Sequence, residues 1–236
     1  MKTPITVCLA WLLIFSSTSF GAVVVNGSFE DPNAGFGWDR EGIGGIVGSG
    51  FGVNPTDGAF QALLQTGDGG VGNTGSSVAD LATFLSITPA DITAVAPNAF
   101  NGTAMSQAIT VNALDTLTFD WNFLTAEGAG NPQDTAFFSL GPAGAPPTFF
   151  LANPANAAGG PVGIFARQTG YNTYSHQFAT GGNYVLGFGV VNVTDAFGPS
   201  ALLFDNVKLT AVPEPTALAG LGLLGLSLAL RRRRRT

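Results

Sequence analysis

The stretch that decides the fold is TLTFDWNFL, residues 116–124. Its apolar side chains, Leu117, Phe119, Trp121 and Phe123, alternate with the polar residues Thr116, Thr118, Asp120 and Asn122. Strict alternation puts the two sets on opposite faces of a β-strand. We therefore predict a strand with its aromatic face in a hydrophobic core and its polar face in water.

The same alternation returns at residues 184–193, and 33 glycines and 14 prolines separate the apolar runs. This composition suits many short strands joined by loops, and it does not suit long helices. Further strands are expected at 22–29, 59–65, 103–111, 135–140, 163–168, 172–178 and 201–210. Residues 22–211 show no internal repeat and are expected to form one mainly β domain, a sandwich or a barrel.

One segment departs from the strand pattern. In DLATFLSITPADITAV, residues 80–95, Leu81, Phe84 and Leu85 follow Asp80 at helical spacing, and Pro89 is placed to open a second helical turn. We predict two short helices that are inserted as a cap on the sandwich.

The charge distribution is uneven. The chain has a net charge of −6, but six of its nine basic residues lie at the termini. The body between them has three basic and fourteen acidic residues, a net charge of −11. Such a surface repels phosphate backbones, which excludes a nucleic-acid partner, and it favours cations. The only cysteine, Cys8, precedes the body, so the body has no disulfide, thiolate nucleophile or cysteine-ligated metal.

The N-terminus has the three regions of a secretory signal peptide: Lys2, an apolar run at residues 5–15, and a small polar stretch at 16–22. We predict a signal peptide over residues 1–21, cleaved after Gly21 or after Ala22. An uncleaved signal anchor is the alternative, although the run is shorter than the ~20 residues that a membrane span needs.

Three elements follow one another at the C-terminus. They are Val212-Pro213-Glu214-Pro215, an uncharged stretch at 216–230, and the cluster Arg231, Arg232, Arg233, Arg234 and Arg235. Fifteen helical residues span about 22 Å, so a transmembrane helix over 216–230 is short against the ~30 Å hydrocarbon core. The arginines would stay in the cytoplasm, with the body on the far side of the membrane.

This tail resembles the PEP-CTERM sorting signal of Gram-negative bacteria, in the same order of motif, short span and arginines over residues 212–235. The resemblance implies processing by the membrane enzyme exosortase, transient membrane anchoring, and release to the cell surface or the extracellular space. The same tail is also labelled an ice-binding-protein C-terminal domain. An ordinary tail anchor with a chance Pro-Glu-Pro is the alternative.

The two ends of the body carry a second resemblance. The body begins with NGSFE at 26–30 and ends with LFDNVKL at 203–209. This pairing is similar to the first and last strands of carbohydrate-binding-module jelly rolls, the galactose-binding-like sandwiches. It implies a single jelly-roll-like β-sandwich.

Signals for catalysis are weak. His176 is the only histidine, and the chain has no G-x-S-x-G motif, so a hydrolase triad has no support. The glycine-rich loop at 67–75 lacks the Lys-Ser/Thr ending of a phosphate-binding loop. Paired carboxylates for glycoside hydrolysis are possible in so acidic a chain, but no pair ranks above another. We therefore expect that the protein is not an enzyme.

A structural calcium site is the more specific candidate. Asp205 is in phase with Leu203, Val207 and Leu209, which predicts a carboxylate pointing toward the core. A calcium ion held by Asp205, Glu30 and loop carbonyls would satisfy it, and the jelly-roll resemblance implies such an ion near the first and last strands. The alternative is that Asp205 accepts backbone N–H bonds at a strand end or bulge.

A second acidic group, Asp120, Asn122, Glu127 and Asp134, lacks the spacing of an EF-hand loop. We interpret it as a solvated face and loop.

Sugar-binding surfaces usually present exposed aromatic rings. Trp38, Tyr171, Tyr174 and Phe36 are the candidates, because Trp121 is expected to point inward. Nineteen phenylalanines against three tyrosines is a core composition. Only one Thr-x-Thr pair is present, at 116–118, which disfavours ice binding.

Together these signals lead to one function and two alternatives. We expect an exported, non-catalytic cell-surface or extracellular-matrix protein that is sorted by its tail and associated with exopolysaccharide. A carbohydrate-binding module with a defined glycan ligand is the first alternative, and a secreted glycoside hydrolase is the second.

Overall fold

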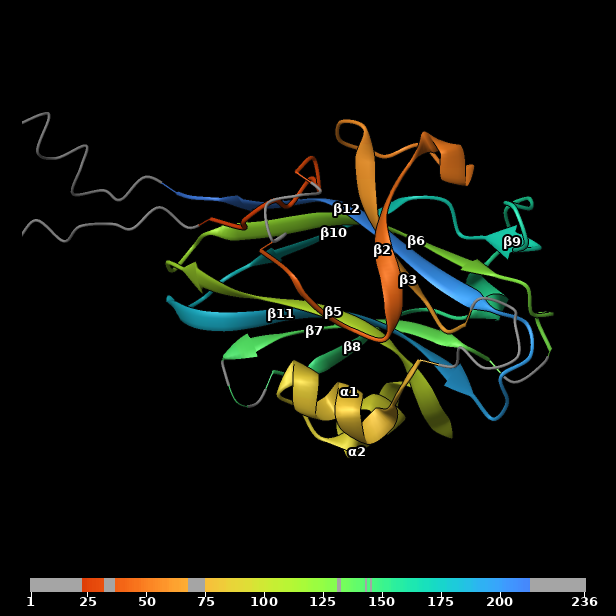
Figure 1. The fold of residues 1–236 in the computed structure, drawn as a ribbon. Coiled ribbons are helices and arrows are strands. Elements are labelled where there is room, and N and C mark those ends of the chain that lie inside the picture. The colour runs from red at the N-terminus through yellow and green to blue at the C-terminus, as the bar shows by residue number, and fades with distance from the viewer. Residues whose placement is uncertain are drawn as a thin grey trace, which may run out of the picture.

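Two antiparallel sheets face each other in the computed structural model of the protein (Figure 1). The structure describes residues 23–31, 37–67, 75–130, 133–142, 144 and 146–212. The predicted signal peptide, and the sorting signal after Val212, lie outside these residues. The predicted fold class, a mainly β sandwich with a two-helix insertion, is confirmed.

Within the described residues each sheet has six strands. The first sheet has the order β1 (Asp39–Glu41), β5 (Ala99–Val111), β11 (Gly182–Val193), β7 (Thr135–Pro142) and β8 (Thr148–Ala152), and β4 (Ser76–Ser77) also pairs with β5. The second has the order β10 (Asn172–Gln177), β6 (Thr116–Thr125), β12 (Ser200–Thr210), β3 (Phe60–Gln65) and β2 (Ile43–Gly48), and β9 (Arg167–Gln168) also pairs with β6. Short 3₁₀ helices lie at Ser49–Phe51 and Pro154–Asn156. The chain changes sheet between β1 and β2, β3 and β4, β5 and β6, β6 and β7, β8 and β9, β10 and β11, and β11 and β12, as in a jelly roll.

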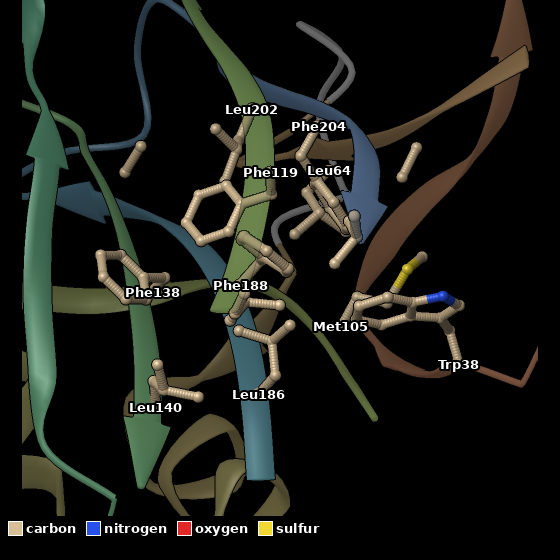
Figure 2. Close-up of a cluster of buried hydrophobic side chains, with 14 of the residues drawn as sticks. Trp38, Leu64, Met105, Phe119, Phe138, Leu140, Leu186, Phe188, Leu202 and Phe204 are labelled. Carbon is tan, nitrogen blue, oxygen red and sulfur yellow. The ribbon is translucent and has the colours of Figure 1, made fainter. Parts of the chain in front are cut away.

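Phenylalanine rings pack together with aliphatic side chains in the core between the sheets, as Figure 2 shows. Phe188 of β11 stacks on Phe204 of β12 with ring centroids 4.0 Å apart, and it meets Phe119 of β6 edge-on at 4.8 Å. These rings come from the inward positions of three central strands of the two sheets. The aromatic face predicted at 116–124 therefore lies in the core, with Leu117, Phe119 and Phe123 buried and Trp121 partly buried.

The two predicted helices cover the outer face of the first sheet (Figure 1). Helix α1 is Val78–Leu85, capped by Ser77, and helix α2 is Pro89–Val95, opened by a capping box between Thr88 and Asp91. Their apolar side chains pack on Phe137 and Val191 of the sheet. Within the described residues no single helix could span a membrane by length and composition. Only α1 and α2 taken together pass that test, and they are bent by 107°.

Most predicted strands are present within four residues of their expected ends, but the structure differs from the prediction at several places. Residues 23–29 form a turn instead of a strand, with Asn26 and Phe29 at positive φ. Of the strand expected at 163–168, only Arg167–Gln168 forms a strand, β9, which pairs with β6. Strands β1, β2, β4 and β8 were not predicted. The sequence of β2, IGGIVG, lacks an alternating pattern because both of its faces are half-buried at a sheet edge.

The polar face of β6 is not in water, which corrects the prediction. Asn122 is fully buried, and its side chain is hydrogen-bonded to Gln168 and Thr169. Leu124, Leu203 and Phe165 form a separate apolar cluster on this side of the second sheet. The segment around residues 157–171 therefore covers a face that alternation alone assigned to solvent.

Candidate functional site

The carboxylate of Asp205 is fully buried and is satisfied by protein hydrogen bonds. Its Oδ2 accepts from the backbone N–H groups of Thr56 at 2.8 Å and Asp57 at 2.9 Å and from the Thr56 hydroxyl at 3.2 Å, and its Oδ1 accepts from the Asn206 N–H at 2.7 Å. Burial raises the pKa of Asp205, and these hydrogen bonds act in the opposite direction. This arrangement matches the alternative to calcium binding, in which Asp205 accepts backbone N–H bonds at a bulge.

The bulge also corrects the predicted phase of the last strand. Pairing between β12 and β6 shifts register between Asp205 and Lys208, and Asn206 has a φ of 55°. Leu203 packs in the outer cluster, whereas Val207 and Leu209 belong to the core side. One extra residue in a strand moves all later side chains to the other face. Asp205 therefore shares the outer face with Leu203 and does not point into the core.

Glu30, the other candidate calcium ligand, serves the same loop. Its Oε1 accepts from the backbone N–H groups of Ala59 at 2.7 Å and Phe60 at 2.8 Å. Asp205 and Glu30 thus bind opposite halves of the segment 56–60, so the structure does bring the first and last segments of the body to one loop.

The donors around these two carboxylates do not fit a calcium site. Calcium needs oxygen ligands with free lone pairs, whereas N–H and O–H groups already point at both oxygens of Asp205 and at Oε1 of Glu30. In the part of the chain that the structure describes, no group of three or more His, Cys, Asp or Glu residues could hold a metal ion. Calcium binding stays a prediction without support from this geometry.

Trp38 was expected as an exposed ring, and this expectation is wrong. Its side chain is 5% exposed and packs against Phe29, Phe188 and Phe204 with centroid distances of 5.6, 5.9 and 5.8 Å. Its Nε1 donates to the backbone carbonyl of Asn26 at 3.3 Å. The ring closes the core beside β1, at the margin of the sandwich, as Figure 2 shows.

The two tyrosine candidates are half-buried and engaged. The Tyr171 hydroxyl donates to Oε1 of Gln61, and burial, together with the negative charges of Asp205 and Asp120, raises the pKa of Tyr171. Tyr174 stacks on Phe119 at 5.0 Å, and burial raises its pKa as well. Neither ring is a free stacking platform, and Phe36 lies outside the described residues.

A pocket of about 190 Å³ opens next to Trp38. Its lining is Phe29, Trp38, Arg40, Gly45, Ile46 and Met105. The exposed Arg40 supplies the only charge in this lining, and its guanidinium donates to the Gly44 carbonyl. Sequence patterns missed the pocket because the strands that form its wall, β1 and β2, have no alternating signature.

The second acidic group is buried, which corrects its interpretation as a solvated face. Glu127 is 6% exposed and Asp134 is 1% exposed. Glu127 Oε2 accepts the backbone N–H of Asp134 at 3.0 Å. Asp134 in turn accepts from the Val193 N–H at 3.2 Å and the Thr66 hydroxyl at 3.3 Å.

Burial and mutual repulsion change how this pair titrates. Burial, followed by the negative charge of Asp195, raises the pKa of Glu127 to about 7 against the hydrogen bond from Asp134. Burial, followed by the charge of Glu127, raises the pKa of Asp134 to about 8. Burial would also raise the pKa of Asp120, but hydrogen bonds from Thr173 and Asn206 hold it below its usual value. The raised values identify Glu127 and Asp134 as groups that are neutral well above the usual carboxyl range.

Comparisons with known proteins bear on the tail and the fold separately. No curated protein matches the chain. The solved structure of TmCBM61 in complex with β-1,4-galactotriose has 11% identity and a TM-score of 0.44, covering 80% of this chain and 97% of that one. A CBM4 structure has 11% identity and a TM-score of 0.35, covering 75% and 95%. At these scores the likenesses carry no conclusion about a ligand, and the fold rests on the strand order and register.

The family model that matches the chain is the PEP-CTERM protein-sorting motif, over residues 211–235. Of these, the structure describes Ala211 and Val212. The motif indicates export, transient anchoring in the membrane, processing by exosortase and surface display. The chain therefore carries a PEP-CTERM sorting motif behind a β-sandwich body.

Proposed function

We propose that the protein is a non-catalytic component of the cell surface or extracellular matrix that associates with exopolysaccharide. The observation that carries this proposal is the sorting motif at 211–235, which sends the sandwich to the outer surface. The net charge of −11 between the terminal basic residues opposes binding to a polyanion. A neutral polysaccharide is therefore the partner that we expect.

The chemistry of the described residues supports a non-catalytic role. The carboxyl pair with raised pKa values, Glu127 and Asp134, is buried and bonded to backbone and side-chain groups, and the pocket beside Trp38 has no acidic or histidine side chain in its lining. His176 lies on the edge strand β10 with its ring edge-on to Phe178 at 5.0 Å. A glycoside hydrolase needs two carboxyl groups that flank a bound sugar.

A defined glycan ligand is the second candidate function, favoured by the pocket beside Trp38. An apolar wall with one guanidinium at its rim suits a sugar ring, because the ring has an apolar face and hydroxyl acceptors. At about 190 Å³ the pocket is smaller than a typical ligand site of roughly 300–1,000 Å³, so it would hold one terminal unit of a chain.

Mass spectrometry of the mature protein tests the sorting step. We expect loss of the first 21 or 22 residues and of the tail beyond Pro215. A variant with Pro213, Glu214 and Pro215 all changed to alanine should keep the tail and remain in the membrane fraction. Recovery of an intact arginine cluster on the released wild-type protein would contradict the proposal.

Co-sedimentation with purified exopolysaccharide tests the association. The mature protein should sediment with neutral polysaccharide and much less with a polyanionic one of the same length. Arg40→Ala separates the two candidates, since it should weaken a pocket-bound glycan and leave a diffuse surface association unchanged. A protein that stays in the supernatant with every polysaccharide from the producing cells would refute both.

A further inference from the structure

Val212, the last described residue, is hydrogen-bonded to the sandwich at the point where the tail begins. The Val212 N–H donates to Oδ1 of Asp115 at 3.3 Å. Asp115 is fully buried, and its Oδ2 accepts the Asn112 N–H at 2.7 Å. The turn at 112–115 is also fastened to the end of β10, because the Leu114 N–H donates to the Phe178 carbonyl at 2.7 Å. The tail therefore leaves the sandwich from a fixed point.

The sequence leaves very little chain between that point and the membrane-anchoring stretch. Only Pro213, Glu214 and Pro215 separate Val212 from the uncharged residues 216–230. Three residues extend at most about 11 Å. A fifteen-residue helix of about 22 Å is also shorter than the ~30 Å hydrocarbon core. A span that is too short draws its flanking residues toward the bilayer or thins it.

The segments that form this end have no exposed charged side chain, because Asp115 is buried, and they carry two exposed apolar side chains. Residues 108–114, 179–184 and 209–212 contain no Asp, Glu, Lys or Arg, in a body that is otherwise strongly acidic. Leu114 is 53% exposed and Val212 is 45% exposed. An acidic surface would be repelled by anionic lipid headgroups, whereas this end would not be.

Leu114 also has an unusual backbone conformation. Its φ is 72°, in the left-handed region where bulky residues are rare and glycine or asparagine is preferred. The site thus tolerates both backbone strain and exposure of a leucine side chain. The bond from the Leu114 N–H to the Phe178 carbonyl holds the backbone in this conformation.

We propose that, while the tail anchors the protein, the turn at 112–115 and Val212 lie against the phospholipid headgroups, with Leu114 as the apolar contact. The proposal rests on the membrane anchoring that the sorting motif indicates, and not on exopolysaccharide binding. The strands of the sandwich then run away from the membrane surface. Strand β12 has eleven residues, or about 37 Å, so the turn at 194–199 at its other end faces away from the lipid.

Quenching by spin-labelled lipid tests this orientation, because the body has no cysteine. The tail-bearing protein with Cys8→Ser is made without a processing enzyme and placed in phosphatidylcholine vesicles that carry nitroxide on the headgroup. A fluorophore is attached at Leu114→Cys or at Phe197→Cys. Phe197 is the matched control, an apolar turn residue that is 85% exposed at the opposite end. Ala113→Cys, also exposed, repeats the measurement with Leu114 intact.

We expect quenching at positions 113 and 114 to exceed that at 197 by at least about threefold. Twelve Gly/Ser residues inserted between Val212 and Pro213 add about 20 Å of mean reach, and they should bring the ratio close to one. Equal quenching at both ends without the insertion, or a ratio that the insertion does not lower, would overturn the proposal. Processing by exosortase and polysaccharide binding are absent from this assay, so its outcome is independent of theirs.

Discussion

Oε2 of Glu127 accepts the backbone N–H of Asp134 at 3.0 Å, and the carboxyl groups of both residues are buried. Among the described residues, the charges that act on these two groups are negative: that of Asp195 on Glu127, and that of Glu127 on Asp134. Burial and a neighbouring negative charge both destabilise the charged form of each carboxyl group, so the folded protein is most stable when both groups are protonated.

This pair predicts that the folded protein loses stability as pH rises. The folded pKa values, about 7 and about 8, lie above the ordinary values of 4.5 and 3.8. The folded state therefore binds more protons than the unfolded state between about pH 4 and pH 8, and the stabilisation is lost as pH rises through this window. Glu127→Gln, which is always neutral, should melt at least about 2 °C above the wild type at about pH 8.5 and close to it at about pH 5.

Thermal melts of both proteins across this range provide the measurement. Asp39→Asn, an exposed carboxylate on β1, is the control and should leave the difference between the two pH values unchanged. A wild-type melting temperature that rises with pH in parallel with that of Glu127→Gln would show that the pair does not titrate as described.

Asp205→Asn should destabilise the body strongly. The substitution removes the charge that receives four hydrogen bonds and turns an amide toward N–H donors. Hydrogen bonds to a charged group contribute about 1.5–3 kcal/mol each, so we expect a loss of at least about 2 kcal/mol in the free energy of unfolding. Asp57→Asn is the matched control, because it keeps the backbone donor and removes only an exposed ion pair with Lys208.

The same variants test calcium in a direct way. Since N–H donors occupy the Asp205 carboxylate, the wild type should melt at the same temperature in excess calcium and in chelator. A calcium-dependent rise of several degrees that disappears in Asp205→Asn would instead establish the metal site, by mass action on the folded state.

Trp38→Ala should lower the stability of the folded protein, whether or not a ligand binds beside this ring. Removing a buried tryptophan costs about 3–5 kcal/mol, which lowers the melting temperature of a domain of this size by roughly 10 °C. Arg40→Ala should shift it by less than about 2 °C, because the side chain is exposed. Denaturant unfolding of both variants measures the difference, and a stable, folded Trp38→Ala protein would contradict the burial of this ring.

Gly187→Ala should weaken the contact between the helical insertion and the sheet. A Cβ at this position would lie 2.5 Å from Cδ2 of Leu85 in α1 and 2.6 Å from Oγ of Ser139 in β7. Overpacking of this kind costs about 1–3 kcal/mol. Gly160→Ala, whose Cβ would meet nothing within 4 Å, should leave the melting temperature unchanged, and similar melts for the two variants would be inconsistent with the close approach of α1.

Features encoded by local periodicity could be predicted from the sequence. The alternation at 116–124 and 184–193 identified two central strands, and the helical spacing after Asp80 identified the insertion, because each pattern reports the geometry of its own segment. The sorting motif was equally legible, since its three parts are contiguous in the chain. The pairing of NGSFE with the last strand also placed Glu30 and Asp205 at one loop.

Burial and partnership depended on contacts between distant segments, and only the tertiary structure decided them. The sequence predicted that Asn122, on the polar face of its strand, and Asp134, in an acidic loop, are exposed to solvent. Segments far from them in sequence cover both. One bulge residue, Asn206, reversed the facing of the strand that carries Asp205. Trp38 lies in the core beside β1 and β2, which close the sandwich there. These two strands have no alternating pattern, so the sequence did not indicate this burial. A period of two residues states which side chains share a face, but whether water or protein covers that face is set by the path of the whole chain.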